Sequence, residues 1–244
     1  MISRVHVATL LALCTASVCL AQQAVSPQVD SDEAPPVIPA SPLNENRIFG
    51  VIPDYQTVTD TGKGVKPLTN GQKWTLALKE TVDPFNVLNA AMGAAFSQHD
   101  NQTPKYGEGG VAFSKRFGAA LGDFGSQNFF SAGLLAVVLH QDPRYYRRGP
   151  GTSVVRRVVY SVSRLVIARQ DSGVEAFNAS GIGGMMMGIA ASNLYYPAAS
   201  RRGSVMACRI STSLTGGVMG NLMSEFWPDI QKKFFHKHSN EPQP

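Results

Sequence analysis

Small residues at a fixed interval of four are the sequence feature that most constrains how this chain folds. The three sets are Gly118, Gly122 and Ser126; Gly184, Gly188 and Ser192; and Gly216, Gly220 and Ser224. Four-residue spacing places each set on one face of an α-helix. Because glycine inside a helix costs up to about 1 kcal/mol relative to alanine, a closely packed neighbouring helix is expected to offset that cost. Such contacts are common in membranes but also occur in soluble bundles, and the spacing fits either setting.

Start signals and apolar spacing then place the helices. Thr69 and Gln72 form a capping box, and Asp83 before Pro84 starts a second helix. We predict an all-α fold, a compact bundle of five or six helices preceded by an irregular arm. The expected ranges are 69–82, 83–98, 111–139, 154–165, 179–194 and 204–226, with a break at Trp227-Pro228-Asp229.

The valine-rich segment that starts at Val154 is interpreted as a helix, although its β-branched residues also suit a strand. On a helical wheel Val154, Val158, Val162 and Leu165 share one face, and Arg156, Arg157 and Arg164 lie away from it. The pattern predicts an amphipathic helix. It lies either in a membrane interface or on the surface of a soluble bundle.

The ends of the chain differ in composition from the middle. Residues 1–21 resemble a signal peptide, with Arg4, an apolar run from Val7 and a cleavage site at Ala21. We expect a Pro-rich disordered linker at 22–46, an irregular arm packed on the domain at 47–68, a helical domain at 69–238 and a disordered tail at 239–244. Cleavage after Ala21 would leave Cys208 as a single, small and buried thiol, without an internal disulfide.

The positive charge is concentrated in one part of the sequence. Only 16% of residues are charged and the net charge is +5, yet residues 101–170 contain ten Lys or Arg and three acids. Such a block favours an anionic surface, and export makes nucleic acid the less favoured partner. The predicted partner is an anionic membrane surface or envelope lipid, and a homo-oligomer is possible. The predicted binding residues are Arg144, Arg147, Arg148, Arg156, Arg157 and Arg164.

Catalytic patterns are scarce. The sequence has no P-loop, no dinucleotide-binding glycine motif after a strand, no G-x-S-x-G elbow and no H-E-x-x-H. The remaining candidates are His140 as a general base and Asp142 as its orienting carboxylate, with Arg144, Arg147 and Arg148 holding a phosphate. Alternatively, Asp142 and Pro143 start a short helical turn, and the arginines and tyrosines form a collar at a membrane boundary. No cofactor or metal site is expected.

Five stretches together resemble a family of uncharacterised exported bacterial proteins. They are Arg47–Tyr55, Lys115–Ala119, His140–Tyr146, Ser192–Pro197 and Glu225–Ile230, and the likeness covers residues 47–235. The resemblance implies an exported bacterial protein whose domain is one unit. It implies no catalytic roles.

The sequence therefore favours a non-enzymatic, membrane-associated structural or binding module in the periplasm or cell envelope. One alternative is an envelope enzyme acting on a phosphate-bearing or lipid substrate around His140, Asp142 and Arg144. Another is a soluble periplasmic protein that binds an apolar ligand at Met185–Met187.

Overall fold

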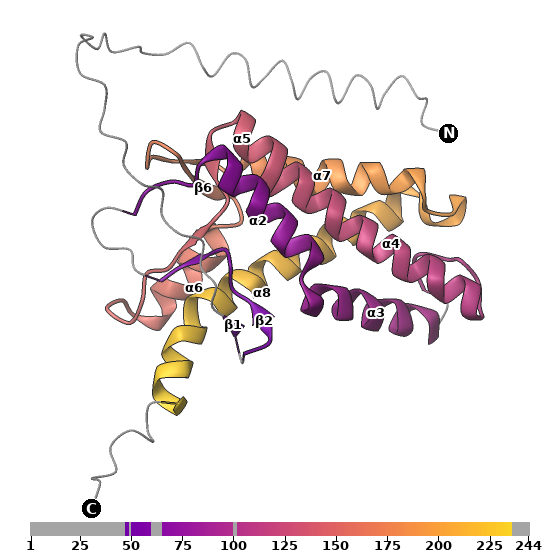
Figure 1. The fold of residues 1–244 in the computed structure, drawn as a ribbon, viewed down its shortest axis with the longest axis horizontal. Helices are drawn as coiled ribbons and strands as arrows, with labels where there is room; N and C mark the ends of the chain where they lie inside the picture. Colours follow the sequence, from indigo (N-terminus) through magenta and orange to yellow (C-terminus); the bar gives the residue numbers. More distant parts are fainter. Residues whose placement is uncertain (1–46, 49, 60–64, 100–101, 236–244) are drawn as a thin grey trace, which may run out of the picture. The chain divides into compact units, whose positions relative to one another are not determined.

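The computed structural model describes residues 47–48, 50–59, 65–99 and 102–235. The predicted signal peptide (1–21), linker (22–46) and tail (239–244) lie outside the described residues. The described part is mostly helical (Figure 1). Its α-helices are α2 (Asn70–Val82), α3 (Pro84–His99), α4 (Gly110–Asn128), α5 (Ala136–Val138), α6 (Val154–Ser163), α7 (Ala179–Ala191) and α8 (Gly203–Phe235). Short 3₁₀ helices follow α7 at Ser192–Leu194 and Ala198–Ser200.

The first helices begin where the sequence predicts. Thr69 and Gln72 make the reciprocal capping box at α2. The Asp83 carboxylate accepts a hydrogen bond of 2.9 Å from the Phe85 N–H, as an N-cap residue does. The predicted helix at 111–139 is also confirmed in extent, because α4 continues without a break through a π-helical stretch, Phe129–Leu135, into α5. The sequence gives no sign of the π-helical geometry.

Helix α7 packs closely against α4 and the π-helical stretch. A Cβ added at Gly184 would lie 2.4 Å from the Ser131 Cα, and one at Gly188 would lie 2.6 Å from the Gln127 side chain. At Gly122 an added Cβ would lie 3.2 Å from the Tyr195 ring. In contrast, no described neighbour lies within 4 Å of such a Cβ at Gly118, Gly216 or Gly220. The expected close contact within the chain therefore does not form at these three glycines.

Three small sheets make the all-α prediction incomplete. Antiparallel strands β1 (Arg47–Ile48) and β2 (Ile52–Pro53) lie in the N-terminal arm, and β3 (Thr57–Val58) pairs in parallel with β5 (Tyr145–Tyr146). The third sheet is antiparallel with the order β4-β6-β7, formed by Gln141–Asp142, Ile167–Gln170 and Glu175–Phe177. The β3–β5 pair joins the N-terminal arm to the segment before α6, and the β4–β6 pair joins that segment to the chain after α6.

The helical turn predicted after Asp142 and Pro143 is wrong. Asp142 ends β4, and its carboxylate accepts the Arg144 N–H at 3.1 Å. This contact turns the chain from β4 into β5 instead of starting a helix. A short Asp-Pro sequence fits both outcomes, and the strand partner β6 comes from 25 or more residues further along the chain.

Helix α8 does not end at Pro228 as predicted, but runs to Phe235 and changes direction in its last part (Figure 1). Proline inside a helix removes one N–H and disturbs nearby carbonyl groups. Here the Glu225 carbonyl oxygen accepts hydrogen bonds from Arg147 Nε and Arg157, both at 2.7 Å. The carbonyl that lacks a helical donor at Pro228 is that of Ser224, and the two arginines hold the next carbonyl, so they fix the helix at the turn that contains the proline.

The amphipathic helix α6 is confirmed, and its buried side is the polar one. Arg157 and Ser161 are buried, whereas Val154, Val155 and Val159 are exposed. Cys208, expected to be buried, is exposed on α8. Within the described residues, no helix has both the length and the apolar content needed to cross a membrane.

A matched pair of glycine substitutions tests this packing. Gly184→Ala is expected to lower the free energy of unfolding by about 1–3 kcal/mol, because the added methyl group meets the Ser131 backbone. Gly220→Ala, with open space around it, is expected to raise the same free energy by up to about 1 kcal/mol. Urea unfolding followed by circular dichroism measures both values. Equal effects of the two substitutions would contradict the packing of α7.

Candidate functional site

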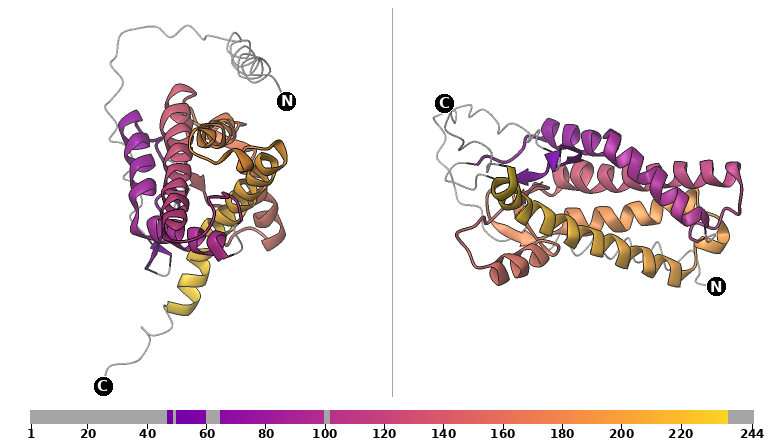
Figure 2. Two further views of the ribbon diagram at one scale, coloured as in Figure 1. Left: turned by 90° about the vertical axis from the view of Figure 1, so that its right-hand side faces the viewer. Right: turned by 90° about the horizontal axis from the view of Figure 1, so that it is seen from below.

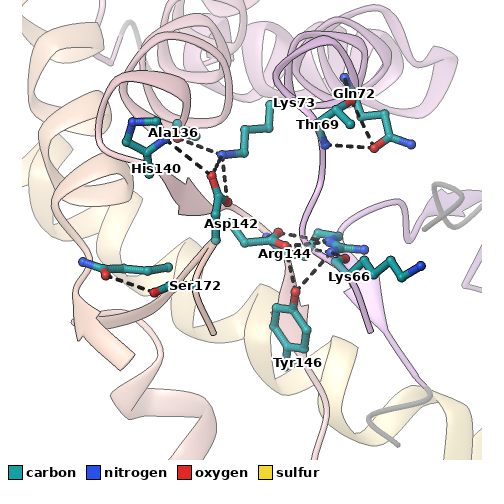
Figure 3. A network of polar contacts seen from close by, with 12 residues as sticks. Lys66, Thr69, Gln72, Lys73, Ala136, His140, Asp142, Arg144, Tyr146 and Ser172 are labelled. Carbon is teal, nitrogen blue, oxygen red and sulfur yellow. Dashed lines mark hydrogen bonds and ion pairs between the residues drawn. The ribbon is translucent and has the colours of Figure 1, made fainter. Parts of the chain in front are cut away.

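A buried cluster of ion pairs and tyrosines gathers the residues that the sequence singles out between Asp142 and Arg157. In its first part, the Asp142 carboxylate is fully buried and pairs with the Arg144 guanidinium at 2.7 Å. The Tyr146 hydroxyl donates to the same carboxylate at 2.7 Å, and Arg144 also donates to the Lys66 carbonyl at 2.6 Å (Figure 3). Burial, together with the Asp142 charge, raises the pKa of Tyr146 above its usual range. Tyr146 therefore stays protonated and acts as a hydrogen-bond donor to Asp142.

The second part of the cluster is centred on Glu225 in α8, whose side chain is completely buried. Each carboxylate oxygen accepts two hydrogen bonds. Oε2 accepts from the Tyr145 hydroxyl (2.8 Å) and the Arg148 N–H (3.0 Å), and Oε1 accepts from Arg157 Nε (2.7 Å) and the Gly149 N–H (3.1 Å). Gly149 has φ +75°, a left-handed conformation that glycine adopts without strain and that brings its N–H to the carboxylate.

The cluster extends to Asp229 and Asp54, and so joins three of the stretches that carry the resemblance. Asp229, one turn after Glu225, pairs with Arg147 and with Arg157 (2.6 Å). Although burial opposes ionisation, the hydrogen bonds from these arginines lower the pKa of Asp229. Asp54 in the N-terminal arm accepts a hydrogen bond from Thr57, and Arg147 lies close enough to act on its charge. Burial nevertheless raises the pKa of Asp54 to about 6.

The predicted surface patch of arginines is therefore wrong for Arg144, Arg147 and Arg157, whose side chains are buried against carboxylates. Their charges are neutralised inside the protein. Arg156 is exposed, and Arg148 is exposed with its guanidinium 4.3 Å from the centre of the Tyr160 ring. Arg164 pairs with the exposed Glu175 at 2.5 Å. Of the six predicted arginines, Arg148 and Arg156 are exposed and Arg164 is partly exposed.

His140 and Asp142 do not form a catalytic pair. The His140 side chain is 74% exposed and its Nδ1 lies 3.9 Å from Asp171 Oδ2. Asp142 is fully buried and engaged by Arg144 and Tyr146. His140 has φ +51°, a left-handed conformation that commonly ends a helix. It follows Leu139, the C-cap residue of α5, so its role in this structure is to end that helix.

A buried lysine near His140 was not predicted from the sequence. Lys73 of α2 is fully buried, and its Nζ donates to the Ala136 carbonyl at 3.0 Å and to Asp171 at 2.7 Å (Figure 3). A cation at the last carbonyl groups of a helix is favourable. Nothing in the local sequence of Lys73 could reveal these contacts, because Ala136 and Asp171 are 63 and 98 residues away.

The other two stretches of the resemblance make two separate sets of polar contacts. Asp123 of α4 accepts hydrogen bonds from the hydroxyls of Tyr195 (2.7 Å) and Tyr196 (2.6 Å) and contacts Arg209 of α8 at 3.2 Å. Arg116 is almost fully buried and donates to the Gly107 carbonyl at 2.8 Å. The charges of all five stretches are thus used largely in contacts within the protein.

Beside the Asp142 cluster lies a cavity of about 370 Å³. Its lining includes three arginines (Arg144, Arg164 and Arg169), three tyrosines (Tyr145, Tyr146 and Tyr160) and apolar side chains from the segment after α6 and from α7 and α8. Among the described residues, no group of three or more His, Cys, Asp or Glu side chains is placed to hold a metal ion. The arrangement of the cavity suits binding of a ligand rather than proton transfer.

No family model, no curated protein and no solved structure matches this chain. The family resemblance therefore remains a prediction. The function has to be argued from the geometry.

Replacing Glu225 tests the buried cluster. Glu225→Gln removes the charge that four donors share, and we expect it to lower the free energy of unfolding by about 3–5 kcal/mol. Glu175→Gln breaks an ion pair whose acid is 62% exposed, and is expected to cost no more than about 1 kcal/mol. Chemical unfolding measures the difference, and comparable losses would show that the Glu225 contacts do not stabilise the fold.

The raised pKa of Asp54 predicts a pH dependence of stability. Between the ordinary value of 3.8 and about 6, the folded protein binds this proton and the unfolded chain does not. The free energy of unfolding therefore falls as the pH rises through this window, by at most about 1.4 kcal/mol per pH unit for one group. Asp54→Asn should make that fall smaller but not remove it, because burial also raises the pKa of Glu80 to about 7 and this group titrates in the same window. The pH profile of urea unfolding between pH 4 and 7 measures it, and an unchanged slope would contradict the assignment.

Proposed function

We propose that this protein is a non-enzymatic, membrane-associated structural or binding module of a bacterial cell envelope. In this proposal the outer face of α2 and α3 contacts the membrane interface. The predicted signal peptide and the family resemblance support export. The described structure supports a peripheral contact, since none of its helices is suited to crossing a bilayer.

The observation that carries the proposal is the outer face of α2 and α3. Between Thr69 and His99 no Lys, Arg, Asp or Glu side chain is exposed. His99, at the end of α3, is exposed but is charged only when protonated. Exposed large apolar side chains repeat at intervals of four on each helix. They are Trp74, Leu78 and Val82 on α2 and Leu88, Met92 and Phe96 on α3. The two helices follow one another along one side of the bundle (Figure 2).

The charges of these two helices face the protein instead. Lys73 and Asp83 are buried, and Lys79 lies over the Tyr55 ring at 5.7 Å from its centre. Exposed apolar side chains that repeat on two successive helices, with no exposed acid or lysine between them, are typical of a contact surface. Trp74, which packs on Phe129 at 5.2 Å, is of the type that settles at a membrane–water boundary.

The remaining exposed charge favours an anionic partner. In the described residues, eight basic residues and two acidic residues are in the exposed class. The basic ones are Lys105, Lys115, Arg148, Arg156, Arg201, Arg202, Lys232 and Lys233, and the acidic ones are Glu108 and Glu175. The attraction to anionic lipid that the sequence suggests is thus proposed to come from these side chains, and not from the buried arginines.

Vesicle flotation tests the proposal. The purified protein is expected to float with vesicles of phosphatidylglycerol and phosphatidylethanolamine, more weakly at high salt. The double variant Leu78→Glu with Met92→Glu should bind at least tenfold more weakly, since each apolar side chain of this size contributes about 1.5–3 kcal/mol on burial. The matched control is the double variant Leu194→Glu with Met219→Glu, which introduces the same two charges at exposed apolar side chains outside α2 and α3 and should bind nearly as the unchanged protein does.

Two results would contradict membrane association. One is a failure of the unchanged protein to float with anionic vesicles. The other is equal binding by the double variant and the control. If sedimentation instead shows dimers that the double variant converts to monomers, the apolar face is covered by a second copy of the chain.

A further inference from the structure

The cavity beside Asp142 is lined by both polar and apolar side chains. Arg164, Arg169, Tyr146 and Tyr160 are called the polar wall here, and the carboxylates of Asp142 and Glu175 line the cavity as well. The apolar wall consists of Leu165, Ile182, Met185 and Leu214, which come from the segment after α6 and from α7 and α8. A volume of about 370 Å³ lies within the usual range for small-molecule sites. A ligand that fits both walls has a polar head and an apolar body.

Among the described residues, the Arg169 guanidinium on the polar wall forms no ion pair with a carboxylate. In the sheet, Arg169 of β6 lies opposite Asp142 of β4 and Glu175 of β7. Each of these acids makes its ion pair with another arginine, Asp142 with Arg144 and Glu175 with Arg164. Within the described part of the chain, Arg169 has no ion pair shorter than 4 Å, although two acids are its strand neighbours. The wall therefore presents one uncompensated cation.

Arg169 is also held in an orientation that suits an anion. Its guanidinium lies over the Tyr146 ring, 4.6 Å from the centre, and Tyr146 is fixed by its hydrogen bond to Asp142. A guanidinium stacked on a ring keeps its N–H groups in the plane, where they can bind a carboxylate or phosphate with two hydrogen bonds. The position of this cation is thus set before any ligand binds.

The apolar wall is built by close packing of its helices. Gly217 of α8 allows Leu165 to approach, because a Cβ there would lie 3.0 Å from the Leu165 Cδ1. Met185 adds a side chain that adapts to the shape of what it contacts. The same methionine is part of the Met185–Met187 run that the sequence suggests for an apolar ligand, whereas Met186 is exposed.

We infer that this cavity binds a small anionic amphiphile, with its carboxylate or phosphate head on Arg169 and its apolar body against Leu165, Ile182, Met185 and Leu214. This inference does not depend on membrane association. It concerns a site inside the helical domain, whereas the proposed membrane contact lies on the outer face of α2 and α3.

Isothermal titration calorimetry with four probes tests the inference, each kept below its micelle-forming concentration. Decanoate and decyl phosphate carry both the head and the chain, decanol carries the chain alone, and inorganic phosphate carries the head alone. We expect decanoate or decyl phosphate to bind at least tenfold more tightly than decanol and inorganic phosphate. The tighter of the two then tells a fatty-acid-like ligand from a phosphate ester. Equal binding of decanol, tighter binding of inorganic phosphate, or no binding of any probe would overturn the inference.

Substitutions at Arg169 locate the head group. Arg169→Gln should weaken the binding of the preferred probe about tenfold or more, and Arg169→Lys should restore part of it because the charge remains but the planar fork is lost. Arg156→Gln removes an exposed arginine that does not line the cavity and should leave affinity unchanged. Equal affinities of Arg169→Gln and the unchanged protein would overturn the assignment of the head.

A larger side chain tests the apolar wall independently. Leu214→Trp fills part of the cavity and should abolish binding of the preferred probe. Circular dichroism and the melting temperature show whether this variant is folded. If it is not, Met185→Phe takes its place. Binding that persists unchanged in a folded, filled variant would place the ligand elsewhere and overturn the inference.

Discussion

A buried carboxylate that must be neutralised is the constraint on which the rest of this structure depends. Burying an unpaired charge costs several kcal/mol, so Glu225 requires donors on all sides. It obtains them from the segment Tyr145–Gly149 and from Arg157. These contacts fix α8 against β5 and α6. Because β5 also pairs with β3, the same carboxylate indirectly positions the N-terminal arm.

The orientation of α6 follows from this constraint. Arg157 must face Glu225 and Asp229, so its side of the helix is buried and the valines on the other sides remain exposed. Each exposed valine forgoes about 1.5–3 kcal/mol at most, whereas leaving the buried Glu225 carboxylate without Arg157 would cost about 3–5 kcal/mol. The internal use of charge by Arg144, Arg147 and Arg157 also changes what the surface can offer. The exposed cations that remain come from other positions, and the outer face of α2 and α3 is apolar.

Helix positions were largely predictable because their signals are local. The capping box at Thr69, the Asp83-Pro84 start and the long apolar stretch up to Leu139 each act within one or two helical turns. The strands were missed because each contains two to four residues and is stabilised by a partner distant in sequence. Pro228 was read as a helix end because the arginines that bind the Glu225 carbonyl are at least 68 residues away.

The sequence by itself determined where most helices start, that its helices carry small residues at four-residue spacing, and which stretches hold its polar chemistry. Only the tertiary structure decided that Gly184 has a close neighbour and Gly220 has none, and that Asp142 binds Arg144 and Tyr146 rather than His140. It also decided which arginine remains available, since Arg169 stays uncompensated only because Arg144 and Arg164 occupy the acids beside it. The physical reason is common to these cases. A helix start depends on neighbours within one turn, whereas the pairing of charges depends on which distant segments the fold brings within hydrogen-bonding distance.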